Sequence, residues 1–152
     1  MIVGEGTQVI RRAARDIYDF VLDPEQYRRA DTKIARVYSL DWRGNQAEIY
    51  YRGRFRGLTT PAARQIISVD PYRRIDIRSK PGTFADYAAP FHGLFILEPL
   101  DDGTTKVFHR EALDPRIPFK WLMEPLLGRW LAEDTPAEVM RLKQLLESAD
   151  DA

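Results

Sequence analysis

The sequence predicts an α+β fold in which a curved antiparallel meander sheet is combined with a long C-terminal helix. From Ile34 onward, apolar residues alternate with polar ones at a period of two, and tight turns separate the runs. After Asp114-Pro115 the period becomes helical. No repeat, low-complexity tract or linker divides the 152 residues, so we expect one domain over residues 1–147 and a frayed tail over 148–152.

The N-terminal segment predicts a short strand followed by two short helices. Residues 6–12 form the expected strand, and a helix begins at Ala13. Asp23 is a suitable N-cap for the second helix because Pro24 fits a first helical position and Gln26 can complete a capping box. Two short helices therefore precede the sheet.

The middle of the chain predicts consecutive antiparallel strands, at residues 34–42, 46–55, 60–69 and 73–79, followed by a hairpin over residues 90–113. Residues 43–45 and 70–72 have turn composition. Residues 80–89 form the longest irregular stretch, which is either a gate to a cavity or a connecting loop.

The hairpin is the most informative stretch because its turn sets its register. Asp101-Asp102-Gly103 matches a three-residue loop with a glycine bulge, which makes Glu98 face Lys106 as an opposite-charge pair. One face is then apolar apart from His109 and Glu111; the face consists of Phe91, Gly93, Phe95, Leu97, Val107, His109, Glu111 and Leu113. We expect this face to point inward, although a one-residue slip would reverse it.

The C-terminal region predicts a long helix broken into two or three pieces. Pro125 removes a backbone donor inside an apolar stripe, which favours a kink. Thr135-Pro136-Ala137-Glu138 has the pattern of a capping box, so a new helix is expected at Pro136.

Composition excludes several classes of site. Lysine plus arginine and aspartate plus glutamate are both 23, so no global charge attracts nucleic acid. The absence of cysteine excludes disulfides and thiolate chemistry and suits a cytoplasmic protein. No apolar run has the length of a membrane span and the start lacks a signal pattern, so we expect no stable membrane insertion.

The order of elements, together with short motifs, resembles a known superfamily. The motifs are AARDIYDFVLDPEQY at residues 13–27, FxLxP at 95–99, GTTKV at 103–107 and MRLKQLLES at 140–148. On these the chain is similar to the START-like (SRPBCC) superfamily of polyketide cyclase/dehydrase and lipid-transport proteins. The resemblance implies a helix-grip fold that encloses an apolar cavity. It implies no shared catalytic motif and no cofactor.

His109 and Glu111 are the candidate polar residues of that cavity. They are two apart on one strand, so they project from one face and can share a proton or bind one polar group. The competing structural interpretation is that the two side chains only satisfy each other's hydrogen-bonding groups. The expected ligand wall is Tyr51, Phe55, Phe91, Phe95, His109 and Glu111, with Trp121 and Trp130 above it.

Other patterns have weaker support. Arg52, Arg54 and Arg56 form a basic row that we interpret as a solvated outer face, with nucleic-acid binding as the alternative. A metal site is not expected, because the only two histidines, His92 and His109, lie on opposite hairpin faces.

Three functions remain open from the sequence. The first is a protein that binds a small hydrophobic ligand, such as a lipid, quinone or polyketide-like aromatic, between the sheet and the C-terminal helix. The second is a polyketide aromatase/cyclase that uses His109 or Glu111 for proton transfer. The third is an interaction module acting through the basic face, which a cavity too small for a drug-sized ligand would favour. Oligomeric state does not follow from the sequence.

Overall fold

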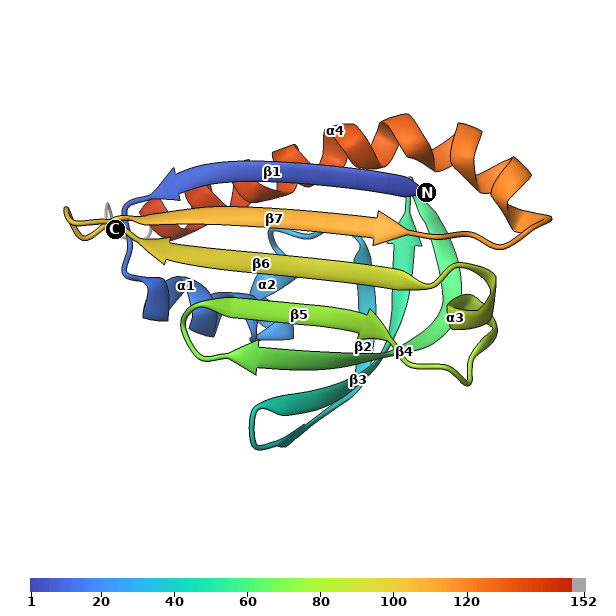
Figure 1. The fold of residues 1–152 in the computed structure, drawn as a ribbon, viewed down its shortest axis with the longest axis horizontal. Coiled ribbons are helices and arrows are strands. Elements are labelled where there is room, and N and C mark those ends of the chain that lie inside the picture. The colour runs from blue at the N-terminus through green and yellow to red at the C-terminus, as the bar shows by residue number, and fades with distance from the viewer. Residues whose placement is uncertain (149–152) are drawn as a thin grey trace.

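A computed structural model describes residues 1–148 and shows one seven-stranded antiparallel sheet with a long helix across it (Figure 1). The strand order is β1-β7-β6-β5-β4-β3-β2. The elements in chain order are β1 (Ile2–Ile10), α1 (Ala14–Val21), α2 (Pro24–Tyr27), β2 (Ile34–Arg43), β3 (Gln46–Phe55), β4 (Leu58–Asp70), β5 (Arg74–Ser79), α3 (Phe84–Ala88), β6 (Phe91–Pro99), β7 (Thr105–Leu113) and α4 (Phe119–Ser148). The predicted tail lies outside the described residues except for Ser148, which ends α4.

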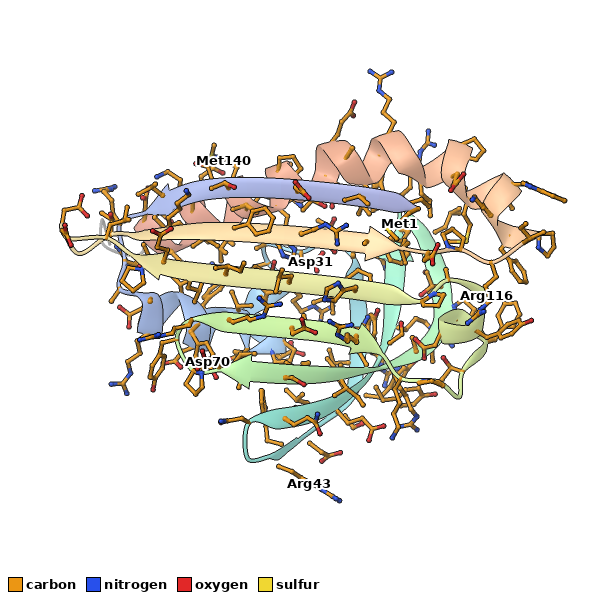
Figure 2. All side chains as sticks on the ribbon, viewed as in Figure 1. Met1, Asp31, Arg43, Asp70, Arg116 and Met140 are labelled. Atoms are coloured by element: carbon orange, nitrogen blue, oxygen red, sulfur yellow. The ribbon has the colours of Figure 1, made fainter. Side chains whose placement is uncertain are left out.

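The sheet curves strongly, so that β2 and β3 cross behind the plane of β5 to β7 (Figure 1). The β2–β3 hairpin projects from the molecule, and the side chain of Arg43 extends from its tip into solvent (Figure 2). Helix α4 packs mainly on β1, and α1 contacts β6. The interior between these layers is the main core, which includes Ile17, Ile75, Phe95 and Leu142.

The register predicted for the β6–β7 hairpin is confirmed. Glu98 pairs with Lys106, Phe95 with His109 and Gly93 with Glu111. Gly103 closes the turn at φ +82°, a conformation that glycine adopts without strain. The expected inner face is also inside, since Phe95 is 1% exposed and His109 is 3% exposed.

Two glycines in β1 allow α4 to lie directly on the sheet. A Cβ added at Gly4 would collide with the side chain of Thr135 and the carbonyl of Leu131, and one at Gly6 would come within 2.8 Å of the Pro136 Cα. Since Gly4 and Gly6 are two apart, both face the helix. The strand and the helix therefore meet without a layer of side chains between them at this crossing.

Several predicted boundaries need correction. Strand β1 begins at Ile2, four residues before the expected start, because its whole length pairs with β7. The stretch predicted to be irregular contains the short helix α3, which Thr83 caps by accepting from the Asp86 amide. The N-cap predicted at Asp23 is confirmed, as its carboxylate accepts from the Glu25 and Gln26 amides.

The breaks predicted in the C-terminal helix are absent. Helix α4 continues through Pro125 and Pro136, although each proline removes one donor from its backbone. At the second position the expected N-cap, Thr135, is fully buried, and its hydroxyl donates to Glu111 instead of capping a helix. Packing against β1 thus overrides the local capping signal.

Candidate functional site

An internal cavity lies between the curved sheet and the α1–α2 segment. Its walls are mainly apolar side chains, and its polar lining comes from four charged and three neutral residues: Asp31, Lys33, His109 and Glu111, with Tyr27, Tyr51 and Gln65. The cavity volume is about 90 Å³. That is smaller than the roughly 300–1,000 Å³ of drug-sized sites, an outcome that favours the interaction module over a binder of drug-sized ligands. In this shape the cavity suits only a small ligand unless the walls move.

Six of the eight predicted wall residues line this cavity: Tyr51, Phe55, Phe91, Phe95, His109 and Glu111. Phe95 stacks on the His109 ring at a centroid distance of 3.8 Å and an interplanar angle of 11°. The Tyr51 hydroxyl accepts a hydrogen bond from Gln65 Nε2 at 2.9 Å. Their place in the wall agrees with the sequence, and their contact with a ligand stays a prediction.

The expected roof over the cavity is wrong. Trp121 lies in the first turn of α4, is 71% exposed and does not line the cavity. Trp130 packs edge-on against Phe55, one layer behind the wall. No α4 side chain is among the lining residues, because α4 lies on β1 and the α1–α2 segment covers the cavity. The cavity is therefore not between the sheet and the C-terminal helix.

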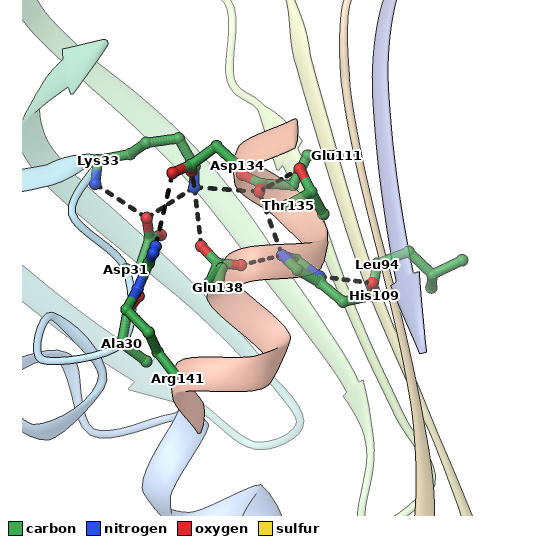
Figure 3. A network of polar contacts seen from close by, with 10 residues as sticks. All are labelled: Ala30, Asp31, Lys33, Leu94, His109, Glu111, Asp134, Thr135, Glu138 and Arg141. Carbon is green, nitrogen blue, oxygen red and sulfur yellow. Dashed lines mark hydrogen bonds and ion pairs between the residues drawn. The ribbon is translucent and has the colours of Figure 1, made fainter. Parts of the chain in front are cut away.

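A buried ionic cluster forms the polar end of the cavity (Figure 3). Its centre is the Lys33 ammonium, whose side chain is 5% exposed. Its Nζ atom lies 2.8 Å from Asp31, 3.1 Å from Glu111, 2.9 Å from Asp134 and 2.8 Å from Glu138. Burial alone would lower the pKa of Lys33, but the four carboxylates together raise it well above its usual value. Lys33 is therefore a fixed positive charge and a poor nucleophile.

His109 is the second cation of the cluster. Its Nδ1 lies 2.9 Å from the Leu94 carbonyl, and its Nε2 lies 2.5 Å from Glu138 and 3.4 Å from Glu111. The Glu138 contact is an ion pair rather than an aligned hydrogen bond. Burial would lower the pKa of His109, but Glu138 and Glu111 outweigh it and raise the pKa to about 10. The ring is thus an imidazolium at neutral pH.

Further side chains complete the cluster from α4 and α2. Thr135 donates to Glu111 at 3.1 Å, and Arg141 approaches Asp134 at 3.5 Å while donating to the Ala30 carbonyl at 2.8 Å. The Tyr27 hydroxyl is buried and makes no hydrogen bond within residues 1–148. Burial and the nearby Glu138 carboxylate raise the pKa of Tyr27 well above its usual value. Its phenol therefore stays neutral and keeps a proton to donate.

Three cluster residues have ligand atoms close enough to hold a metal ion. These atoms, from His109, Glu111 and Glu138, lie within 4.8 Å of one another. The Lys33 ammonium, however, already contacts both glutamates, and a metal would have to compete with that internal cation. The donor set in this arrangement fits the ammonium better than an added ion.

Sequence reasoning missed Tyr27, Asp31, Lys33, Asp134 and Glu138. One signal was present for Glu138, because Leu131, Thr135, Glu138 and Leu142 follow the spacing of one buried helix face. A carboxylate within such a stripe indicates a buried partner. The capping-box interpretation of Thr135 to Glu138 concealed it. No comparable signal marks Lys33.

The outer face of the sheet carries the residues assigned there. Arg52 and Arg54 are exposed on β3, whereas Arg56 is exposed in the β3–β4 turn and donates to the Leu126 carbonyl of α4 at 2.8 Å. His92 lies 3.1 Å from Asp76, away from the cluster that holds His109. No helix among the described residues is long and apolar enough to cross a membrane.

Comparisons with known proteins agree with this geometry. A family model described as polyketide cyclase / dehydrase and lipid transport matches residues 1–147. A START superfamily protein from Mycobacterium smegmatis has a TM-score of 0.72 and 14% identity, with 97% of this chain and 98% of that one covered. A protein from Thermus thermophilus has a TM-score of 0.70 and 16% identity, with coverages of 97% and 98%.

An aromatase/cyclase from a Streptomyces species has a TM-score of 0.64 and 17% identity, and the alignment covers 96% of this chain and 82% of that one. No curated protein sequence matches the chain significantly. The structural likenesses show a shared fold, and the predicted helix-grip architecture is confirmed.

Proposed function

This chain belongs to the family of polyketide cyclase/dehydrase and lipid-transport proteins, and on that premise we propose that it binds a small hydrophobic ligand in its internal cavity. One observation carries the proposal: an apolar cavity ends in a buried ionic cluster. Buried charges are costly even when paired, and replacing a buried ion pair by well-packed apolar residues is often neutral or stabilising. A polar end inside an apolar site is the arrangement that orients a bound molecule.

The size of the cavity limits the ligand. A volume of about 90 Å³ is below the roughly 150 Å³ of an apolar cavity that holds benzene, so even a single-ring ligand requires the walls to move somewhat. The α1–α2 segment consists of two short helices, of 8 and 4 residues, and lies outside the hydrogen-bonded sheet. Val21, Leu22, Pro24 and Tyr27 come from it, so its displacement would enlarge the site.

Binding without turnover is favoured by the state of His109. Both ring nitrogens are engaged by protein groups, and the raised pKa keeps the ring protonated. A general base needs a free lone pair near neutral pH, which this imidazolium lacks. Lys33 is likewise held as a charged ammonium. The cluster therefore acts as a rigid polar wall.

A cyclase is the second candidate, because His109 and Glu111 do face the cavity. The solved neighbours include an aromatase/cyclase from Streptomyces and a norcoclaurine synthase from Thalictrum. In such a reaction the wall would fold a reactive chain, and Glu111 would move a proton. Unchanged turnover of a cyclisable polyketide analogue in Glu111→Gln would remove Glu111 from that role.

Native mass spectrometry of the purified protein tests the binding proposal. We expect a copurifying small molecule in the parent protein, which is lost in Ile77→Phe because the larger ring fills the cavity. The matched control Ile96→Phe places the same ring on the exposed side of β6 and keeps the ligand.

A parent protein that neither carries nor binds any small apolar molecule would contradict the proposal. Retention of that protein on heparin, lost when Arg52, Arg54 and Arg56 are replaced by alanine, would then support an interaction module.

A further inference from the structure

Every cation of the buried cluster is already engaged by protein groups. The Lys33 ammonium has three N–H donors and contacts four carboxylates. His109 directs one nitrogen at the Leu94 carbonyl and the other at two glutamates. Arg141 donates to the Ala30 carbonyl and forms an ion pair with Asp134; its buried Nη2 makes no hydrogen bond within residues 1–148, but Arg141 does not line the cavity. A ligand carboxylate entering the cavity would find no free cation in this cluster.

The cluster also carries an excess of negative charge. Four carboxylates, from Asp31, Glu111, Asp134 and Glu138, face three cations, from Lys33, His109 and Arg141. With every group ionised, one negative charge remains uncompensated. Burying a further anion beside it is doubly unfavourable, since the anion loses its hydration and meets like charge.

One buried donor residue on the cavity wall makes no side-chain hydrogen bond. Tyr27 lines the cavity and is only 6% exposed, and its hydroxyl makes no aligned hydrogen bond in the described part of the chain, although it lies near the Glu138 carboxylate. Leaving a buried hydroxyl without a hydrogen bond is unfavourable, so a ligand atom that accepts from it binds more tightly. Asp31 lines the same cavity and offers carboxylate oxygens as acceptors. A ligand hydroxyl satisfies both neighbours, because it can accept from Tyr27 and donate to a carboxylate.

Resting on the proposed function, we infer that the cavity selects uncharged ligands that carry a hydroxyl group, and excludes ligands that carry a carboxylate. Tyr27 is the specificity-determining residue of this site. The preferred class is a phenol or a small alcohol with an apolar body, in contrast to a fatty-acid type of ligand.

Four single-ring probes of similar size test the inference: toluene, p-cresol, benzoate and benzylamine. Their affinities for the full chain at pH 7 are measured by calorimetry or ligand-observed NMR. We expect p-cresol to bind about fivefold more tightly than toluene, which corresponds to one net hydrogen bond. Benzoate should bind at least about tenfold more weakly than p-cresol.

The variant Tyr27→Phe removes only the hydroxyl and should abolish the preference for p-cresol while leaving toluene binding unchanged. Tyr38→Phe, at an exposed position on β2, is the matched control and should retain the preference. Because the probe series is also measured on the parent protein, the inference can be tested even if Tyr27→Phe does not fold.

Three results would overturn the inference: benzoate binding as well as p-cresol, benzylamine binding more tightly than p-cresol, or a preference that persists in Tyr27→Phe. Failure of all four probes to bind would refute the proposed function itself, and the inference would fall with it. Equal binding of all four would leave the binding function standing and refute only the selectivity.

Discussion

Replacing Lys33 with methionine removes the centre of the buried cluster and leaves the stem volume nearly unchanged. The ammonium contacts four carboxylates at 2.8–3.1 Å. Because the Lys33 side chain is only 5% exposed, solvent screens these ion pairs weakly. Breaking a buried ion pair on one side costs about 3–5 kcal/mol, because the opposite charge stays buried without compensation. We expect Lys33→Met to lose about that much free energy of unfolding at pH 7.

Urea unfolding followed by circular dichroism measures this loss, and an unchanged m-value would show that only stability changed. The loss should shrink at pH 5, since buried carboxylates without a cation take up protons in the folded state. The double variant Lys33→Met with Glu138→Gln should recover about 1–3 kcal/mol relative to the sum of the single effects.

The control is Lys106→Met, which removes an exposed ammonium from the cross-strand pair with Glu98 and should cost less than about 1 kcal/mol. A loss in Lys33→Met no larger than in this control would refute the view that the cluster depends on a shared cation. Strict additivity in the double variant would refute it as well.

Three further changes test other parts of the structure. The pKa of His109 is raised to about 10 in the folded protein, against about 6.5 in the unfolded chain, so protonation of His109 stabilises the fold fully below pH 6.5 and less as pH rises toward 10. The free energy of unfolding should therefore fall by up to about 1.4 kcal/mol per pH unit between pH 7 and 9. A flat profile over this range would contradict the ion pairing of His109. Gly4→Ala should lower stability by at least about 1–3 kcal/mol in chemical unfolding, because its Cβ collides with α4. Gly128→Ala, with nothing within 4 Å, should instead raise stability by up to about 1 kcal/mol, and similar effects from the two would refute close packing at Gly4. Asp23→Ala should lower the free energy of unfolding by about 1 kcal/mol in the same chemical unfolding assay, because the α2 N-cap is lost. Asp23→Asn should retain most of that stability, because asparagine also caps helices.

Local patterns were enough to predict the sheet and the cavity wall. The β6–β7 turn length set which residues face each other, so Phe95, His109 and Glu111 could be placed on one inner face before any tertiary contact was known. Hydrogen bonding across a tight turn is a short-range interaction, and strand periodicity follows from backbone geometry alone. For the same reason the Asp23 cap was predictable.

The breaks in α4 and the roof over the cavity were predicted wrongly because they depend on how the helix docks. Proline and capping signals favoured breaks, but α4 is continuous through both prolines, and at Pro136 it packs directly against Gly4 and Gly6. In the same arrangement Trp121 is exposed, and the α1–α2 segment rather than α4 covers the cavity. For residues other than proline, helix propensities differ by at most about 1 kcal/mol per residue. The free energy gained by burying side chains in the tertiary structure is larger than such differences.

By itself the sequence determined that His109 and Glu111 share an apolar wall, since side chains two residues apart on one strand project from the same face. Only the tertiary structure decided what they pair with. Lys33 and Glu138 are 105 residues apart and meet because the helix crosses the sheet at one particular angle and depth. No local sequence pattern encodes this contact, yet it makes the imidazole charged and engages the cations. It also leaves the Tyr27 hydroxyl without an aligned hydrogen bond within residues 1–148.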